Sequence, residues 1–333
     1  MKKDYRLNTI ETHTAGEPTR ILISGINLYP LFGRSVAEQR DMFAEKFDHI
    51  RELLMREPRG HDDMFGAVPV KPEDDEADIG VIFMHTTGYL DMCGHGTIGV
   101  VTALLERGIL PEKKEIKIET PAGIVETVPV IKENKVEKVR MKNVDSSFLG
   151  KETVELDLAD IKSDIEVNLA YSGNLVGLVD VEETGLSVGR QELETLKKIG
   201  IELRKKLNEK RNFENPFSGK KIEVSLIEFC EERKGVDKNL VVFADGSIDR
   251  SPCGTGTCAK MTYLYHEGKL DVNEEYRYRS ILDTEFDGKI LKAEEKEEIT
   301  VITPEISGSA YIIGRSTFVL DPKDPLSGFS LYK

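Results

Sequence analysis

Hydrophobic residues in the first part of the chain recur at helical spacing. After Ser35 they stand three and four positions apart, which places one apolar stripe along a helix. Ser35 and Glu38 have the spacing of a capping box, which is typical of a helix start. A second long helix is expected from about Arg190 to Arg211. The stripe of the first helix consists of Met42, Phe43, Phe47, Ile50 and Leu54.

Most other segments alternate between apolar and polar residues, as half-buried strands do. Clear examples lie at 116–131, 138–144 and 309–320, and short turns separate them. Strands that outnumber helices in this way predict an α+β protein with largely antiparallel sheets. The regular strand-helix alternation of a doubly wound fold is not present.

The chain also repeats itself. Residues 81–110 align without a gap with residues 241–270, with ten identities in thirty positions. Each copy runs from an apolar strand through a loop and a Cys-Gly-x-Gly-Thr turn into a helix that ends at Gly108 or Gly268. The repeat predicts two pseudo-symmetric halves, with Cys93 and Cys253 in equivalent places at helix N-termini.

The turn at 92–99, "MCGHGTIG", allows two interpretations. Its glycines match the G-x-G-x-x-G pattern of a dinucleotide phosphate turn, and the second copy, "GTGTCA", matches the Gly/Ala form. A dinucleotide site also needs an acidic residue at the end of the second, parallel strand. Glu119 is expected inside an alternating polar strand instead. The pattern therefore favours a turn that presents a thiol.

Such a turn suits acid–base chemistry. A helix N-terminus lowers the pKa of a cysteine and also holds an anion, such as a substrate carboxylate. Two such turns on either side of a cleft would place one thiol on each face of a small substrate. Inversion at a Cα centre needs a base on one face and an acid on the other, so the pattern predicts a racemase or epimerase. Cys230 and Cys258 lack this context and are expected in the core.

Composition limits the possible partners. The net charge of −14 argues against nucleic acid, which needs a clustered positive surface. The chain has no window approaching 18 apolar residues and no apolar stretch behind Lys2 and Lys3, so we expect neither a membrane span nor a signal peptide, and a cytoplasmic protein. The four cysteines lack paired zinc-site spacing, and we expect free thiols and no metal.

At these turns the sequence resembles the proline racemase family, whose fold is similar to that of diaminopimelate epimerase. The signatures "MCGHGTIG" and "DRSPCGTGTCA" carry the resemblance, with "HTAGEPTR" (13–20), "EPRGHDDMFGAV" (57–68) and "SGNLVGLVD" (172–180) in the expected order. It implies two halves, each a curved, mostly antiparallel sheet around a central helix, with the active site in the cleft between them. It also implies a homodimer.

The resemblance implies roles for individual residues. Cys93 and Cys253 match the acid/base pair, with no metal or pyridoxal cofactor. Four residues match the positions that hold the substrate carboxylate through backbone N–H groups: Gly94, His95, Gly254 and Thr255. His95 and Asp249 match positions that contact the substrate nitrogen or orient the thiols, although His95 could simply cap its helix and Asp249 could pair with Arg250.

Domain boundaries follow from the same resemblance. In relatives the last strand can return to the first half, which predicts residues 1–132 with 312–333 as the half that carries Cys93 and residues 133–311 as the half that carries Cys253. The repeat alone favours a contiguous split near residue 155.

Three substrates remain open within the family. Family dehydratases typically have threonine in place of the second cysteine, so Cys253 favours racemisation or epimerisation over dehydration of trans-3-hydroxy-L-proline. "GHGT" resembles the hydroxyproline 2-epimerases. Phe65 and Phe243 match an apolar wall that favours unsubstituted proline, although Phe243 could be a strand-core residue like its repeat counterpart Phe83. Proline is the leading prediction. Outside the enzymes, the alternative is an amino-acid binding protein with inert cysteines.

Overall fold

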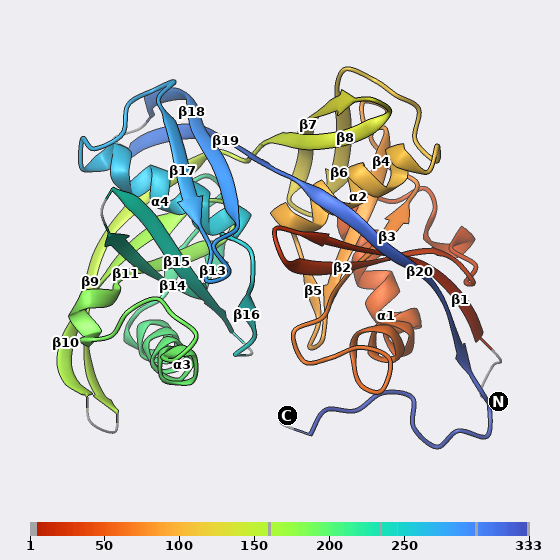
Figure 1. Ribbon diagram of the computed structural model, residues 1–333, viewed down its shortest axis with the longest axis horizontal. Helices are drawn as coiled ribbons and strands as arrows, with labels where there is room; N and C mark the ends of the chain where they lie inside the picture. Colours follow the sequence, from red (N-terminus) through yellow and green to blue (C-terminus); the bar gives the residue numbers. More distant parts are fainter. Residues whose placement is uncertain (1–4, 159–160, 234, 245, 297–298, 332–333) are drawn as a thin grey trace. The chain divides into compact units, whose positions relative to one another are not determined.

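The structure, a computed structural model, describes residues 5–158, 161–233, 235–244, 246–296 and 299–331. Its backbone divides into two compact units, Met1–Met141 with Gly308–Lys333 (unit 1) and Lys142–Ser307 (unit 2). Each unit combines strands with two long helices, and each contains one Cys-Gly-x-Gly-Thr turn (Figure 1). This confirms the predicted α+β class with two similar halves.

Unit 1 is built on two helices of different character. α1 (Val36–Met55) starts at the predicted capping box, where Ser35 Oγ accepts the N–H of Glu38 at 3.3 Å and the Ser35 N–H donates to Glu38 Oε2 at 3.1 Å. α2 (Gly94–Glu106) is buried from its first residue through Leu105, as expected for a central helix. The remaining elements are β1 (Tyr5–Thr14), β2 (Glu17–Ser24), η1 (Tyr29–Leu31), β3 (Phe65–Val70), β4 (Ile79–His85), β5 (Tyr89–Leu90), β6 (Ile116–Thr120), β7 (Gly123–Lys132), β8 (Lys135–Lys142) and β20 (Ala310–Leu320).

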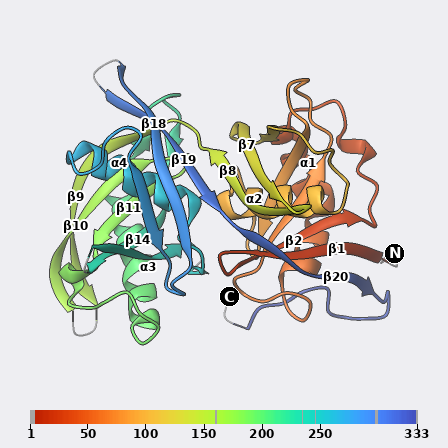
Figure 2. The ribbon, with the colours of Figure 1, turned by 45° about the horizontal axis from the view of Figure 1, so that its top comes forward.

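The end of the chain returns to its beginning. β20 pairs antiparallel with β1, from Ala310 opposite Thr14 to Leu320 opposite Tyr5. The two strands lie side by side in both ribbon views (Figures 1 and 2). Residues 308–333 therefore belong to unit 1, although the whole of unit 2 precedes them in the chain.

The core of unit 1 lies under α1. Phe43, Ile50 and Leu54 of the predicted stripe are fully buried, while Met42 and Phe47 pack at the edge of the same cluster. Burial of a large apolar side chain stabilises a fold by about 1.5–3 kcal/mol, so this stripe explains why α1 packs on the sheet.

Unit 2 has the same plan. α3 (Leu193–Lys210) starts three residues later than predicted and packs Leu196, Ile199, Leu203 and Leu207 into the core. α4 (Gly254–His266) follows the second cysteine turn. The remaining elements are β9 (Ser146–Leu158), β10 (Ile161–Tyr171), β11 (Leu175–Asp180), η2 (Val181–Thr184), β12 (Phe213–Glu214), β13 (Lys221–Ile222), β14 (Val224–Arg233), β15 (Val236–Phe243), β16 (Ile248–Asp249), β17 (Glu275–Arg279), β18 (Glu285–Lys296) and β19 (Ile299–Gly308).

Glu119 corrects one expectation about the sheet. Most strand pairs are antiparallel, but β6 runs parallel to β4, and β17 runs parallel to β15 in the equivalent place. Glu119 thus lies near the end of a parallel strand and is 7% exposed, whereas the sequence pattern predicted an alternating polar strand. Its carboxylate accepts N–H groups of Val36 at 2.9 Å, Glu73 at 2.7 Å and Asp74 at 3.1 Å. Glu119 therefore stabilises the start of α1 and a loop.

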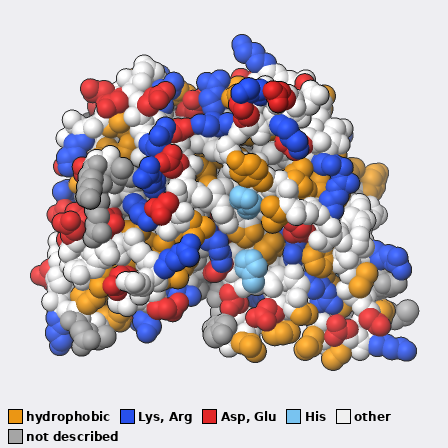
Figure 3. Space-filling view, viewed as in Figure 1, with side chains coloured by type: hydrophobic (Ala, Val, Ile, Leu, Met, Phe, Trp, Pro, Cys, Tyr) orange, Lys and Arg blue, Asp and Glu red, His pale blue; other side chains and the backbone are white. Residues whose placement is uncertain are grey.

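The surface matches a charge-rich protein. Acidic and basic side chains are interspersed over the face shown in Figure 3. In the described part of the chain, no helix has an apolar stretch long enough to cross a bilayer.

Candidate functional site

Cys93 caps the N-terminus of α2. Its backbone is extended, with φ −148° and ψ 108°, and its carbonyl accepts the N–H of Thr97 at 2.9 Å. The residue is 6% exposed, and Sγ lies 3.5 Å from Nε2 and 3.6 Å from Nδ1 of His95. N–H groups of a first helical turn carry partial positive charge, which favours a nearby anion. The Cys93 thiol therefore lies beside an imidazole at a position that stabilises negative charge.

His95 is held as a neutral imidazole. The residue is buried, and burial lowers its pKa to about 3 because charge is poorly solvated there. Its backbone carbonyl accepts the hydroxyl of Thr14 at 2.8 Å. The ring of Phe65 meets the imidazole edge to face, with centroids 4.8 Å apart. Unit 1 thus brings together Cys93, His95 and Phe65, three of the predicted site residues.

The glycines of the first turn are required by close packing. A Cβ on Gly96 would lie 2.9 Å from Cys93 Sγ and 2.9 Å from Cε1 of Phe83. A Cβ on Gly99 would lie 2.9 Å from the hydroxyl oxygen of Thr12. All three distances are too short for a carbon atom, so the nucleotide-like pattern here follows from packing around a thiol and strand residues.

Cys253 caps α4 in a strained conformation. Its φ of +59° with ψ 121° is unusual for a residue that has a side chain. Sγ accepts the N–H of Gly256 at 3.4 Å and lies 3.4 Å from Oγ1 of Thr255. The carbonyl accepts the N–H of Thr257 at 2.8 Å. The residue is 4% exposed, so Cys253 is a buried thiol that points at the first turn of its own helix.

Hydrogen bonds hold this strained turn. The Cys253 N–H donates to Ser251 Oγ at 3.1 Å. The Pro252 carbonyl accepts Asn239 Nδ2 at 2.7 Å and Thr257 Oγ1 at 3.1 Å. Each bond contributes about 0.5–1.5 kcal/mol, enough together to offset about 1–3 kcal/mol of backbone strain. The network therefore fixes the direction of the second thiol.

Asp249 acts on Cys253 through Ser251. Its Oδ1 accepts both the N–H and the hydroxyl of Ser251, at 2.8 and 2.7 Å. The residue is 1% exposed, and burial raises the pKa of its carboxyl to about 6. Hydrogen bonds with Ser251 and Cys253, followed by the charge of Arg250, oppose this rise.

Phe243 ends β15, just before the second turn. It is partly buried and packs against the cluster that contains Cys253 and Ala259. Its counterpart Phe83 is 1% exposed. Unit 2 thus brings together Phe243, Asp249, Cys253 and Thr255, while Gly254 is the first residue of α4. Gly94 holds the same position in α2.

A pair of equivalent hydroxyls was missed by sequence reasoning. In unit 1, Thr14 Oγ1 donates to the carbonyl of His95 at 2.8 Å, and in unit 2, Ser172 Oγ donates to the carbonyl of Thr255 at 2.8 Å. Both carbonyls lie two residues after the cysteine. The available signal was a hydroxyl residue shortly before a glycine in each "HTAG" and "YSG" segment. Ser251, two residues before Cys253, was missed as well.

Burial corrects the expected effect of the helix on Cys253. Burial, followed by the charges of Asp249 and Glu228, raises the pKa of this thiol well above its usual value. The hydroxyl of Thr255 and the N–H of Gly256 oppose this rise with smaller effects. A helix N-terminus alone would lower the pKa, but here the cost of desolvating a thiolate is larger.

The other two cysteines lie in the core. Cys230 and Cys258 are buried, and neither forms a disulfide. Burial raises the pKa of Cys230 to about 12 and that of Cys258 further above its usual value. Within the described ranges, His, Cys, Asp and Glu side chains form no group of three that could hold a metal ion.

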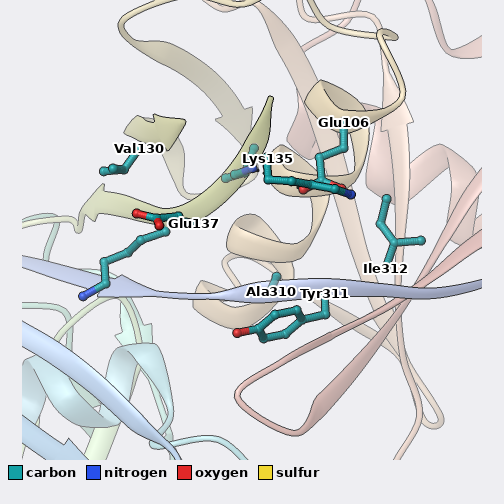
Figure 4. Close-up of a pocket in the computed structure, with 9 residues that line it drawn as sticks. Glu106, Val130, Lys135, Glu137, Ala310, Tyr311 and Ile312 are labelled. Carbon is teal, nitrogen blue, oxygen red and sulfur yellow. Dashed lines mark hydrogen bonds and ion pairs between the residues drawn. The ribbon is translucent and has the colours of Figure 1, made fainter. Parts of the chain in front are cut away.

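A large groove in unit 1 lies away from the thiol. It has a volume of about 830 Å³ and is bordered by Lys135 and Glu137 of β8, by Tyr311 and Ile312 of β20, and by Glu106 (Figure 4). Glu106 ends α2, so about 20 Å of helix separates it from the N-terminal turn. The groove lining has no thiol or imidazole, and its charges form ion pairs such as Lys135 with Glu106 at 2.7 Å.

Comparison with known proteins supports the family resemblance that was inferred from the two cysteine turns. The model of the family described as proline racemase matches residues 9–330. The proline racemase of Acetoanaerobium sticklandii is 38% identical, over 99% of this chain and 100% of that protein. A trans-3-hydroxy-L-proline dehydratase of Bacillus thuringiensis subsp. konkukian is 36% identical over the same shares. A crystal structure of a hydroxyproline epimerase from Agrobacterium vitis, with bound trans-4-hydroxy-L-proline, superposes with a TM-score of 0.88 at 25% identity, over 98% of this chain and 96% of that one.

The chain belongs to the proline racemase family. It is therefore an enzyme of the racemase and epimerase type, which confirms the predicted isomerase class over the alternative of a binding protein.

Proposed function

We propose that this protein is a cofactor-independent proline racemase that uses Cys93 and Cys253 as its two acid–base groups. The observation that carries the proposal is that a thiol caps the N-terminus of each of two equivalent helices, α2 and α4. The full-length similarity to a proline racemase supports it. The N-cap residues of α2 and α4 are both cysteines, and the thiol of each is the group that exchanges a proton in this proposal.

The reaction removes one proton from Cα of the substrate and adds another proton to Cα from the opposite face. A thiolate on one face of the substrate takes the Cα proton, and the electron pair remains on Cα, stabilised by the carboxylate. The thiol on the other face then gives its proton to Cα, which inverts the centre and leaves the first cysteine protonated. The backbone N–H groups that follow each cysteine, from Gly94 and His95 and from Gly254 and Thr255, hold the substrate carboxylate in this proposal.

His95 and Asp249 assist the thiols in different ways. The neutral imidazole of His95 lies 3.5 Å from the Cys93 sulfur, where it can exchange a hydrogen bond with either charge state of the thiol. Asp249 orients Cys253 through Ser251, which accepts the Cys253 N–H at 3.1 Å. We assign both as positioning residues of the thiols.

The test is proton exchange at Cα. Wild-type protein is incubated with L-proline in D2O, and deuterium incorporation is followed together with optical rotation. We expect both to proceed in the wild type and to be abolished in Cys93→Ser and Cys253→Ser. Cys258→Ala is the matched control, because this buried thiol lies inside α4 and not at its N-cap. Full activity in either serine variant contradicts the two-base mechanism.

Hydroxyproline 2-epimerisation is the second candidate. The structural similarity to a hydroxyproline epimerase favours it. Phe65 favours proline, because it is 2% exposed and packs on His95, and an apolar wall leaves a ring hydroxyl without a partner. An unpaired buried hydroxyl costs about 1–3 kcal/mol, so we expect kcat/KM for L-proline to exceed that for trans-4-hydroxy-L-proline by about 5- to 150-fold. The reverse preference would make the protein an epimerase.

Dehydration is the third candidate, supported by the similar dehydratase. It converts trans-3-hydroxy-L-proline to pyrroline-2-carboxylate and needs one base only. Cys253 argues against it as the main activity. The same incubation with this substrate, followed by an assay for the imine product, measures it directly. We also propose a homodimer, which light scattering after size-exclusion chromatography tests.

A further inference from the structure

A buried carboxyl lies against the first turn of α4. Glu228 of β14 is 0% exposed. A Cβ built on Gly256 would lie 2.2 Å from Glu228 Oε2, so the carboxyl packs directly on the Cα of this glycine. The N–H of the same glycine donates to the sulfur of Cys253 at 3.4 Å. Glu228 and the Cys253 sulfur therefore contact one and the same residue.

A single amide links Glu228 to the cysteine turn. Asn239 Nδ2 donates to Glu228 Oε1 at 3.1 Å and to the Pro252 carbonyl at 2.7 Å. Pro252 directly precedes Cys253 in the chain. The carboxyl is thus part of the network that holds the strained turn, and its charge acts on the thiol at the end of that network.

Other polar groups surround the carboxyl. Cys230 Sγ on the same strand lies 3.9 Å from Oε1, and it accepts the hydroxyl of Tyr278 from β17 at 3.2 Å. Hydrogen bonds with Tyr278 and Asn239 favour the charged carboxylate of Glu228. The charge of Lys260 on α4 favours it less, and the charge of Asp249 on β16 opposes it. Burial is the largest effect and raises the pKa of Glu228 to about 7. The carboxylate is therefore increasingly charged as the pH rises through neutrality.

Strand register shows which residue of unit 1 takes the place of this carboxyl. Glu228 stands opposite Val241 on β15. Val81 is the repeat counterpart of Val241, and it stands opposite Pro69 on β3. In unit 1 the first turn of α2 packs instead on the ring of Phe83. The two thiols therefore have different surroundings, an apolar ring beside one turn and a carboxyl beside the other.

The difference has an electrostatic consequence. The positive end of a helix stabilises a thiolate at its N-cap. A negative charge packed against the same turn in a medium of low dielectric constant opposes that stabilisation. In α4 this charge is supplied by Asp249, which has the larger effect on the pKa of Cys253, and by Glu228.

We propose that Glu228 is a positioning residue that keeps Cys253 protonated in the resting enzyme, so that Cys93 is the thiolate and Cys253 the proton donor before substrate binds. The inference rests on the proposed two-base function. It assigns different starting roles to two cysteines that occupy equivalent positions in the repeat.

The test is alkylation of each thiol in the absence of substrate. The folded protein is treated with iodoacetamide at a series of pH values, and peptide mass spectrometry gives separate rates for Cys93 and Cys253. Only thiolates react, so the way each rate rises with pH reports the charged fraction of that thiol, separately from its access to the reagent. In the wild type at about pH 8 we expect Cys93 to react about tenfold faster or more, as one pKa unit requires. Equal rates, or a faster Cys253, would overturn the proposal without any variant.

Glu228→Gln removes the charge and keeps an oxygen that can accept the Asn239 amide. We expect the rate at Cys253 to rise about tenfold and the rate at Cys93 to stay within about twofold. Glu232→Gln is the matched control, because Glu232 is exposed on the same strand, and it should change neither rate. An unchanged rate at Cys253 in a folded Glu228→Gln protein, checked by its melting transition, contradicts the proposal.

The labelling rates and the D2O exchange separate the two proposals. Cα exchange with equal labelling of both thiols leaves the racemase and removes the role of Glu228. The opposite result is unequal labelling that responds to Glu228→Gln, with no Cα exchange on any of the three substrates. It would support the effect of the carboxyl on Cys253, but it would contradict the proposed function and the role of Cys253 as proton donor.

Discussion

Replacement of His95 by glutamine tests the state of the imidazole beside Cys93. Burial lowers the pKa of His95 from 6.5 to about 3, so the folded protein binds this proton more weakly than the unfolded chain. The sign follows from linkage: the contribution of His95 to stability is full above pH 6.5 and is lost as the pH falls from 6.5 toward 3. The loss amounts to about 1.4 kcal/mol per pH unit, or about 2 kcal/mol at about pH 5.

Urea unfolding at about pH 7.5 and about pH 5 measures this loss. Asp249 and Glu228 have the opposite sign, because burial raises their pKa values to about 6 and about 7 and their contributions grow as the pH falls. The useful quantity is therefore the difference between wild type and His95→Gln at each pH. We expect this difference to become about 2 kcal/mol smaller at the lower pH.

A matched variant controls for general effects of acid. His266→Gln removes an exposed histidine at the end of α4, and its difference from the wild type should be the same at both pH values. If His95→Gln also shows a constant difference, the imidazole is not held neutral by burial, and its assigned role beside the thiol is wrong.

Two further changes test the packing of the turns. Gly96→Ala places a methyl group 2.9 Å from Cys93 Sγ, so we expect at least a tenfold loss of kcat, while Gly189→Ala, which meets no atom within 4 Å, keeps full activity in the same racemisation assay. Thr14→Val and Ser172→Ala each remove one hydroxyl from a buried carbonyl and should lower the free energy of unfolding by about 1–3 kcal/mol in urea titrations; two unchanged midpoints would show that these bonds contribute nothing.

Local pattern was sufficient for much of the fold. The capping box at Ser35 and the stripe that contains Phe43 predicted α1, because a helix start and an amphipathic face are both encoded within a few residues. The repeat around Cys93 and Cys253 predicted two similar halves and a helix after each turn. The capping box, the apolar stripe and the cysteine turns each depend on residues that are close in sequence, so they can be recognised in a single sequence.

Pairing between distant strands was harder to predict. The parallel pairing of β6 with β4 joins two strands that α2 separates in the chain, so the burial of Glu119 and its hydrogen bond to the start of α1 were missed. The return of β20 to β1 joins residues about 300 positions apart, and it was expected from family resemblance, not from the pattern of the strand.

By itself, the sequence determined that two cysteines each stand at the start of a helix with glycines beside them, and it predicts that their thiols carry the chemistry. Only the tertiary structure decided what surrounds each thiol. His95 lies beside Cys93 and Phe65 packs on His95, whereas Asp249 and Glu228 lie near Cys253. Phe65 and Glu228 come from other strands, β3 and β14, which only the fold brings to the turns. The physical reason is that the charge state of a buried thiol depends on desolvation and on nearby charges, and both are properties of the packed fold.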